Sequence, residues 1–335
     1  MMPKTFGDKP LLEVENLSTR FFTQDGVVKA VDGVSYNVNR GETIALVGES
    51  GCGKTVSALS ILRLIPDPPG KIISGKIMFD GTDLLQLPKE KMSDIRGAKI
   101  SMIFQEPLTS LDPVLTIGRQ LTEALERHRG LRGHEAMEEA TRLLRIVGIP
   151  QPDQRVKEYP HQFSGGMRQR AMIALAISCQ PQLILADEPT TVVDVTIQVQ
   201  LLELIRNITK DLNTALILIT HNLGIVARYA HRVYVMYAGH IVEHGSASEI
   251  YHNPFHPYTR GLLGSVPRLD EPRKTRLQPI EGQPPDLINA PEGCAFCPRC
   301  NAVCESCSNV TPSLVEVAPG HFAACHSIKI SGKRL

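Results

Sequence analysis

A glycine-rich segment at residues 48–55 carries the strongest chemical pattern in the sequence. It matches GxxxxGK[ST], and its residues are Gly48, Glu49, Ser50, Gly51, Cys52, Gly53, Lys54 and Thr55. The glycines let backbone N–H groups close around phosphate oxygens, Lys54 neutralises phosphate charge, and the Thr55 hydroxyl ligates Mg²⁺. The segment lies between an apolar run at 43–47 and a helical stretch at 55–64, as this chemistry requires. We therefore expect this phosphate loop to bind a nucleotide.

Two adjacent carboxylates, Asp187 and Glu188, end the apolar run 183–186. Such a run predicts a buried strand that delivers both acids to the carboxyl edge of a sheet, where ligands of open α/β sheets bind. One acid suffices for Mg²⁺, and the other can polarise a water molecule for in-line attack on the γ-phosphate. An ordinary strand end with a solvated acidic turn is the alternative, which the preceding phosphate loop disfavours.

A second helix start with anion-binding character follows Ser164. The residues Ser164, Gly165, Gly166 and Met167 precede a helical stretch at 170–177. A serine and two glycines that open a helix leave N–H groups free for an anion, although the same residues also suit a simple N-cap. A second phosphate site in a nucleotide-binding chain suggests that two copies enclose ATP between them.

The elements expected around these motifs alternate between strand and helix. Residues 11–38 alternate apolar and polar types and break at Asp25-Gly26, which predicts a β-hairpin. Helical spacing at 120–129 and 135–147 predicts a mostly helical insertion from about 106 to 177. Further strands are expected at 75–81, 183–186, 215–220, 234–237 and 241–243, with a helix at 195–212. Strand, helix and strand between 183 and 220 predict a parallel crossover.

Composition bounds the class of protein. The chain has 335 residues, a length suited to two domains, and 36 Lys+Arg against 35 Asp+Glu. This balance gives no electrostatic reason for nonspecific binding to nucleic acid or to an anionic bilayer. The sequence has no run of roughly 18 apolar residues and no signal-peptide core at its start. We expect a cytosolic protein that reaches a membrane only by docking on a partner.

The C-terminal part has a different composition. Prolines recur after about Ser246 and predict an extended, loop-rich appendage. Six cysteines gather near its end: Cys294, Cys297, Cys300, Cys304, Cys307 and Cys325. In a cytosolic protein such clustering indicates a metal or cluster site rather than disulfides.

Two kinds of site compete for these cysteines. The spacing from Cys294 through Cys297 and Cys300 to Cys304 is that of a bacterial ferredoxin run, with Glu305 in place of the usual proline. A structural zinc is the main rival, because it accepts four thiolates or three thiolates with one imidazole. His321 and His326, which could supply the imidazole, lie close to Cys325 in the sequence. Unliganded thiols are the third possibility.

The motifs taken in order resemble the ATP-binding cassette (ABC) family from about Leu11 to Ser246. The resemblance implies an α/β fold with a parallel-sheet core, an antiparallel β subdomain and a helical insertion, followed by a small Cys-rich C-terminal extension. It predicts a nucleotide-binding domain at 10–250 and the extension at 251–335. It also implies that the chain is an ATPase that uses ATP and Mg²⁺.

The same resemblance implies a role for each matching residue. In chain order, Phe21 stacks on adenine, Gln105 senses the γ-phosphate and Mg²⁺, Ser164–Met167 form the signature loop, Asp187 is the acid on the Mg²⁺ side, Glu188 is the general base, Asp194 lies between two protomers, and His221 contacts the γ-phosphate. From composition alone, Phe22 is an equal candidate for the adenine contact. Cys52 is interpreted as a small tolerated residue of the phosphate loop.

The sequence departs from the family pattern at three places. Met167 stands where Gln is commonest, the loop before Asp194 reads Thr191-Val192-Val193, and Asn222 follows His221 where Asp is frequent. None of the departures removes a group that the chemistry needs, so we expect a competent ATPase.

Five segments resemble the oligopeptide/dipeptide permease branch: Leu108–Pro113, Tyr159–His161, Met236–Gly239, His256–Thr259 and Glu281–Pro285. The branch implies a subunit that powers import of oligopeptides or dipeptides, with nickel chelates or glutathione as alternative solutes. A soluble, non-transport ABC ATPase is a further alternative. The branch also selects Cys294, Cys300, Cys307 and Cys325 as ligands of a [4Fe–4S] cluster, which leaves Cys297 and Cys304 as spare thiols.

The partners implied by this branch are all proteins. They are a second, related but distinct ABC ATPase subunit that completes a heterodimer, two integral membrane permease subunits, and an extracytoplasmic solute-binding protein. The chain is then a peripheral protein on the cytoplasmic face of the cell (inner) membrane, and no nucleic acid is involved.

Overall fold

The structure is a computed structural model that describes residues 9–190, 195–265, 279–330 and 333–334. Its residues group into two units, which we describe separately. The first unit contains Asn39–Glu42 and Gln86–Leu218. The second unit contains Pro10–Val38, Thr43–Leu85 and Ile219–Leu335.

An antiparallel sheet opens the second unit. It consists of β1 (Leu12–Thr23), β2 (Gly26–Val38), β4 (Gly70–Phe79) and β5 (Thr82–Asp83), in the order β2-β1-β4-β5. The hairpin register pairs Thr23 with Gly26, so the predicted turn at Asp25-Gly26 is confirmed. Apolar side chains that alternate along β1 are buried, as the period of a strand requires.

A second set of strands in this unit has the order β11-β12-β10-β9-β3. These strands are β3 (Thr43–Val47), β9 (Arg232–Tyr237), β10 (His240–Ser246), β11 (Val315–Ala318) and β12 (His321–Ala323). Strands β3 and β9 are parallel, whereas β9, β10, β12 and β11 pair antiparallel in turn. The predicted hairpin that turns at Gly239 is confirmed.

The C-terminal extension is more than the loop-rich appendage that the prolines predict, because β11 and β12 add to the edge formed by β10. Glu243 of β10 pairs with Ala323 of β12. Helix α11 (Pro257–Gly264) contributes Tyr258 to a core shared with Val235 of β9, and Phe296 joins the same core. The extension therefore shares buried apolar surface with strands that belong to the predicted nucleotide-binding domain.

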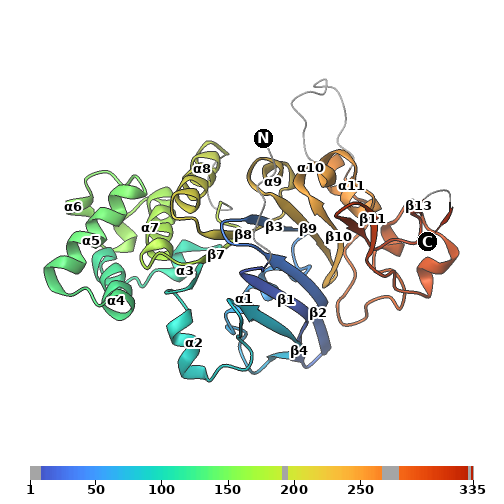
Figure 1. The fold of residues 1–335 in the computed structure, drawn as a ribbon, viewed down its shortest axis with the longest axis horizontal. Helices are drawn as coiled ribbons and strands as arrows, with labels where there is room; N and C mark the ends of the chain where they lie inside the picture. Colours follow the sequence, from blue (N-terminus) through green and yellow to red (C-terminus); the bar gives the residue numbers. More distant parts are fainter. Residues whose placement is uncertain (1–8, 191–194, 266–278, 331–332, 335) are drawn as a thin grey trace. The chain divides into compact units, whose positions relative to one another are not determined.

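Helices and short segments complete the second unit. They are α1 (Lys54–Ile61), α9 (Leu223–Tyr229), α10 (Ala247–His252), the 3₁₀ turns η2 (Cys297–Arg299) and η3 (Glu305–Ser308), and the strands β13 (Lys329–Ile330) and β14 (Lys333–Arg334). Figure 1 shows α10, α11 and the extension in orange to red.

The first unit is mainly helical, as predicted for the insertion, and in Figure 1 its helices run from cyan at α2 through green to olive-yellow at α8. Its helices are α2 (Lys89–Ile95), α3 (Pro107–Ser110), α4 (Ile117–Arg129), α5 (Gly133–Ile146), α6 (Pro152–Arg155), η1 (Pro160–Gln162), α7 (Gly165–Ile177) and α8 (Val195–Asp211). Helices α4, α5 and α7 pack against one another. Apolar residues at helical spacing, such as Leu121 and Leu125 of α4, form the buried face.

The strands of the first unit position its acidic residues. Strands β6 (Ile100–Ile103) and β7 (Leu183–Asp187) are parallel neighbours, and β8 (Ala215–Thr220) lies next to β7 and crosses the unit boundary after Leu218. All five residues of β7 are buried, as a continuous apolar run in a parallel sheet predicts.

Among the described residues, no helix is both long enough and apolar enough to cross a lipid bilayer.

Candidate nucleotide-binding site

The phosphate loop connects β3 to α1 in the second unit, as predicted. Gly53 is the N-cap of α1 and has a φ of 103°, which side chains of L residues rarely allow. A Cβ atom at Gly53 would also collide with the carbonyl oxygen of Ala30. The backbone can therefore adopt this path only with glycine, and the free N–H groups of the first turn of α1 remain available to an anion.

Lys54 is held inside this loop. The residue is only 4% exposed, and its Nζ atom donates hydrogen bonds of 2.8 Å to the carbonyl oxygens of Gly48 and Glu49. Both acceptors are uncharged carbonyl oxygens, which do not neutralise the positive charge of the ammonium group. A phosphate group bound in the loop would neutralise it. The geometry agrees with the predicted role of Lys54.

Cys52 lies within the same loop, and its Sγ atom is 3.7 Å from Lys54 Nζ. Burial raises the pKa of the Cys52 thiol, while the Lys54 ammonium group acts in the opposite direction. The thiol therefore stays protonated at neutral pH, which agrees with its interpretation as a tolerated small residue rather than a reactive one.

The acidic residues lie at the end of β7 in the first unit. Asp187 is buried, and the next residue, Glu188, has a φ of 42°. The left-handed conformation is strained for a residue with a side chain, and strain of this kind concentrates at functional sites. The Gln105 amide donates a 3.3 Å hydrogen bond from Nε2 to Glu188 Oε2. The structure thus brings together two of the residues predicted to act on the γ-phosphate.

The signature loop opens helix α7 in the same unit. Ser164 is the N-cap, and its Oγ atom accepts a 3.3 Å hydrogen bond from the backbone N–H of Met167. The helix begins at Gly165, five residues earlier than predicted, because the glycines themselves form its first turn. Ser164 and Gly165 are exposed, as an anion-binding helix start requires.

Sequence reasoning missed Gln169. Its side chain is buried, and Nε2 donates a 2.6 Å hydrogen bond to the Pro189 carbonyl oxygen. This bond joins α7, whose first turn belongs to the signature loop, to the segment directly after Glu188. Only the position of Gln169 one helical turn beyond Gly165 could have suggested it.

The remaining predicted residues that the structure describes are His221, Phe21 and the alternative Phe22. His221 follows β8 directly, and Asn222 is the N-cap of α9, with Oδ1 accepting a 3.1 Å bond from the Gly224 N–H. The Asn at this position therefore has a capping role of its own. Phe21 pairs with Gly70 across β1 and β4 and is partly buried, whereas Phe22 is 51% exposed.

Asp194 and the preceding Thr191-Val192-Val193 lie outside the described residues. Their predicted place between two protomers stays a prediction. The choice between Phe21 and Phe22 as the adenine contact also stays open.

The C-terminal cysteines share one neighbourhood in the second unit. The Cys294 N–H donates a 2.8 Å bond to the Cys307 carbonyl oxygen, and the Sγ atoms of Cys304 and Cys307 are 3.1 Å apart. Burial raises the pKa of Cys294 and of Cys300, and the nearby Cys325 thiol adds to both shifts. All eight cysteines, each within the described residues, are free thiols.

The two imidazoles offered as alternative zinc ligands are engaged elsewhere. His321 Nε2 donates a 2.8 Å bond to the buried Glu243 carboxylate, and His326 Nε2 lies 2.8 Å from the Val310 carbonyl oxygen. Each of these contacts uses one ring nitrogen, and the other nitrogen of His321, Nδ1, is buried without a hydrogen-bond partner. Within the described part of the chain, the His, Cys, Asp and Glu side chains form no group of three or more that is arranged to hold a metal ion, so the predicted cysteine ligand set stays a prediction.

Comparison with known proteins decides the family. A model of the ABC transporter family matches residues 31–191, and a model of the oligopeptide/dipeptide transporter C-terminal region matches residues 242–307. The dipeptide transport ATP-binding protein DppD of Bacillus subtilis (strain 168) is 50% identical over 315 residues, which cover 94% of each chain. The chain belongs to the ABC transporter family.

Two further comparisons agree with this family. The oligopeptide transport ATP-binding protein OppD of Bacillus subtilis (strain 168) is 48% identical over 312 residues, 93% of this chain and 87% of that protein. A dimeric structure of MJ0796, a bacterial ABC transporter cassette, superposes with a TM-score of 0.63 at 25% identity, over 70% of this chain and 98% of the other. The predicted family, α/β fold and ATPase activity of this ABC chain are confirmed.

Proposed function

We propose that this ABC ATPase powers the import of dipeptides or oligopeptides. The similarity to DppD carries this proposal, because it runs through 94% of the chain at 50% identity. The match to the oligopeptide/dipeptide transporter C-terminal region adds independent support from residues outside the ATP site. A non-transport ABC ATPase does not explain that region.

We infer the catalytic roles from the positions of the side chains in each unit. The phosphate loop, through Lys54 and Thr55, holds the phosphates of ATP, while Asp187 lies on the side of Mg²⁺. Glu188 orients a water molecule and accepts its proton as the water attacks the γ-phosphorus, and ADP leaves. Mg²⁺ supplies charge neutralisation when it is bound. The Gln105–Glu188 hydrogen bond supports a joint action on the γ-phosphate.

The other roles complete a site shared by two subunits. His221 contacts the γ-phosphate, Phe21 contacts adenine, and Asp194 lies between the protomers. Residues Ser164–Met167 contact the ATP held by the partner subunit. The exposed N-cap at Ser164 supports this role, because its own phosphate loop is a separate segment of the chain.

We propose the same partners as the branch implies: a related but distinct ATPase subunit, two membrane permease subunits and an extracytoplasmic solute-binding protein. Exposed apolar residues of the first unit offer a surface for the permease subunits. Val114 is 76% exposed, Tyr159 is 40% exposed, and Phe104 precedes Gln105 and is 36% exposed. Docking there places the chain at the cytoplasmic face of the membrane.

We propose a nucleotide-binding domain at 10–250, with a helical insertion at about 106–177, and an extension at 251–335. In the extension, Cys294, Cys300, Cys307 and Cys325 are proposed to hold a [4Fe–4S] cluster with a structural role. The shared neighbourhood of the thiols supports thiolate ligands. Zinc bound by four thiolates is the alternative.

Transport by the purified complex tests the proposed function. The chain is isolated from its native membrane with its permease subunits, reconstituted in proteoliposomes with the solute-binding protein, and supplied with a radiolabelled dipeptide and ATP. ATP-dependent uptake of the dipeptide is expected. Uptake of a nickel chelate or of glutathione without peptide uptake would overturn the substrate, and failure to isolate any membrane subunit would overturn the transport role.

Metal analysis tests the cysteine site. The protein is purified without oxygen, and iron and zinc are quantified. About four irons per chain with a brown colour are expected. Equimolar zinc without iron would replace the cluster by a structural zinc site.

A further inference from the structure

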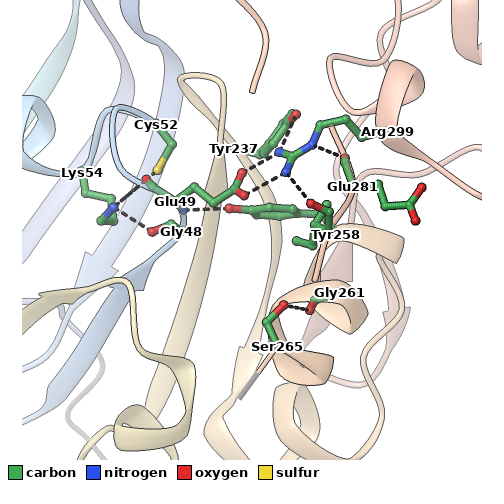
Figure 2. A network of polar contacts seen from close by, with 11 residues as sticks. Gly48, Glu49, Cys52, Lys54, Tyr237, Tyr258, Gly261, Ser265, Glu281 and Arg299 are labelled. Atoms are coloured by element: carbon green, nitrogen blue, oxygen red, sulfur yellow. Dashed lines mark hydrogen bonds and ion pairs between the residues drawn. The ribbon is translucent and has the colours of Figure 1, made fainter. Parts of the chain in front are cut away.

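The C-terminal extension contacts the phosphate loop at Glu49. Arg299, the last residue of η2, forms two parallel charged hydrogen bonds with this carboxylate: Nη1 to Oε2 at 2.6 Å and Nη2 to Oε1 at 2.9 Å. The Tyr258 hydroxyl of α11 accepts a 2.8 Å bond from the Glu49 backbone N–H. Figure 2 shows both contacts, and all three residues belong to the second unit.

Arg299 is fixed by its surroundings. Its side chain is 4% exposed, and Nε donates a 3.0 Å bond to the Glu281 carbonyl oxygen. The guanidinium lies about 6 Å from the ring centres of Tyr237 and Phe296, at 5.9 and 6.0 Å. The Glu49 carboxylate raises the pKa of Arg299, so the charge persists at every working pH. A planar guanidinium held in this way orients the carboxylate that it binds.

Glu49 in turn helps to hold the side chain of Lys54 in place. The Glu49 carbonyl oxygen is one of the two acceptors of Lys54 Nζ, at 2.8 Å. The side chain, N–H and carbonyl of Glu49 therefore each have a partner, and two of these partners come from the extension. Without Arg299 and Tyr258, the backbone that holds the Lys54 ammonium group would be free to move.

We propose that Arg299 is a positioning residue for ATP, which holds Glu49 so that the phosphate loop keeps the shape that receives the phosphates. The C-terminal extension is then part of the nucleotide site rather than an independent appendage. This inference rests on the proposed binding of ATP by the phosphate loop.

A double-mutant cycle on the full-length protein tests the proposal. The Kd for ATP is measured for Arg299→Gln, Glu49→Gln and the double variant. Arg260→Gln is the control, because Arg260 is an exposed arginine of the extension whose Nε donates to the Pro254 carbonyl oxygen. Each single change is expected to raise the Kd about tenfold, since displacement of a positioning group by an ångström has effects of this size or larger. The double variant should bind like the single variants, because one interaction is lost in all three.

Steady-state kinetics separate positioning from a general loss of structure. Because bound ATP restores the loop, Arg299→Gln should raise the KM for ATP about tenfold and change kcat less than threefold. Arg299→Lys retains one charged donor and should recover part of the affinity. If Arg299→Gln does not fold, Glu49→Gln breaks the same ion pair from the loop side and carries the test.

The outcomes distinguish this inference from the proposed function. If wild-type protein binds ATP, Lys54→Ala does not, and folded Arg299→Gln and Glu49→Gln bind as tightly as wild type, only the positioning role is overturned. The positioning role would also be overturned if the Kd of the double variant rose by the product of the two single effects, because the two residues would then act independently. If wild-type protein and the Arg260→Gln control do not bind ATP, the proposed function itself fails.

Discussion

Glu188 combines two features that bear on its proposed role. Its backbone is left-handed, with a φ of 42°, and its carboxylate accepts a hydrogen bond from the Gln105 amide. The strand β7 ends at Asp187, which is buried, whereas the next residue, Glu188, is only partly buried. This difference fits one acid for Mg²⁺ and another for water.

Glu188→Gln should reduce ATP hydrolysis by at least about 100-fold, because the amide cannot accept the proton of the attacking water. The substitution keeps the size of the side chain, so ATP binding and ATP-driven pairing of subunits should persist. Phosphate release in single-turnover and steady-state assays measures the loss. Glu203→Gln on α8 is the control, because the Glu203 carboxylate contacts Arg206 of the same helix at 3.5 Å and lies outside the predicted site. Near wild-type turnover by Glu188→Gln would exclude this residue as the base.

The functional residues found from sequence lie in contiguous motifs, whereas a residue such as Arg299 acts through a partner that is distant in the sequence. The phosphate loop and the pair Asp187-Glu188 are contiguous, and their function follows from local backbone geometry. Arg299 is 250 residues from Glu49, and an isolated arginine between two cysteines carries no pattern. Only tertiary structure could reveal that contact.

At the scale of elements, helices α4 and α5 pack through apolar faces and are joined by a charged group at their surface. Glu139 of α5 is 2.7 Å from Arg129 of α4 and 2.6 Å from Arg142 of its own helix. Hydrogen bonding by Arg142, with a further contribution from Arg129, lowers the pKa of Glu139 to about 2. The folded state therefore stabilises the ionised form of Glu139, whose pKa would otherwise be near 4.5.

Glu139→Gln should lower the free energy of unfolding by about 1 kcal/mol at pH 7, a figure reduced for the solvent exposure of both arginines. Because the folded pKa is depressed, this stabilisation is present above about pH 4.5 and is lost as the pH falls towards 2. Urea unfolding at pH 7 and at pH 3.5 should show a difference between variant and wild type that shrinks at the lower pH. Glu138→Gln is the control, because Glu138 is 69% exposed and lies 3.5 Å from His134. A difference that does not change with pH would contradict the assignment.

The short strands of the extension could not be predicted from the sequence. Strand β12 pairs with β10 over only two residue pairs, and the buried Glu243 accepts bonds from His321 Nε2, from the Phe255 N–H and from the His256 N–H. A three-residue strand has no detectable period, and its register depends on a partner far away in sequence. His321, a candidate zinc ligand by sequence, is engaged in this structural contact.

At the scale of the whole molecule, the ATP site divides into separate segments. The phosphate loop belongs to the second unit, whereas the signature loop opens α7 in the first. Each loop opens a helix, whose first N–H groups are available to an anion. In the proposed site, one ATP molecule takes the phosphate loop of one subunit and the signature loop of the other. A pair of subunits that exchange signature loops would use both loops of each chain.

Ser164→Arg tests this exchange. A long cation at the N-cap removes the Oγ atom that accepts the Met167 N–H and blocks the exposed helix start. ATP binding by the isolated chain should continue, because Lys54 lies in another segment. ATP-driven association with the partner ATPase subunit should be lost, and hydrolysis at the partner's phosphate loop should fall at least about 100-fold.

Light scattering of the ATP-loaded Glu188→Gln complex, with and without Ser164→Arg, measures this association. His134→Arg is the control, because it places a cation on α5 of the same unit at a side chain that is 87% exposed. If Ser164→Arg supports association and turnover like the control, the signature loop does not contact ATP across a subunit interface. If ATP binding by the isolated chain is lost instead, the loop acts on the chain's own nucleotide.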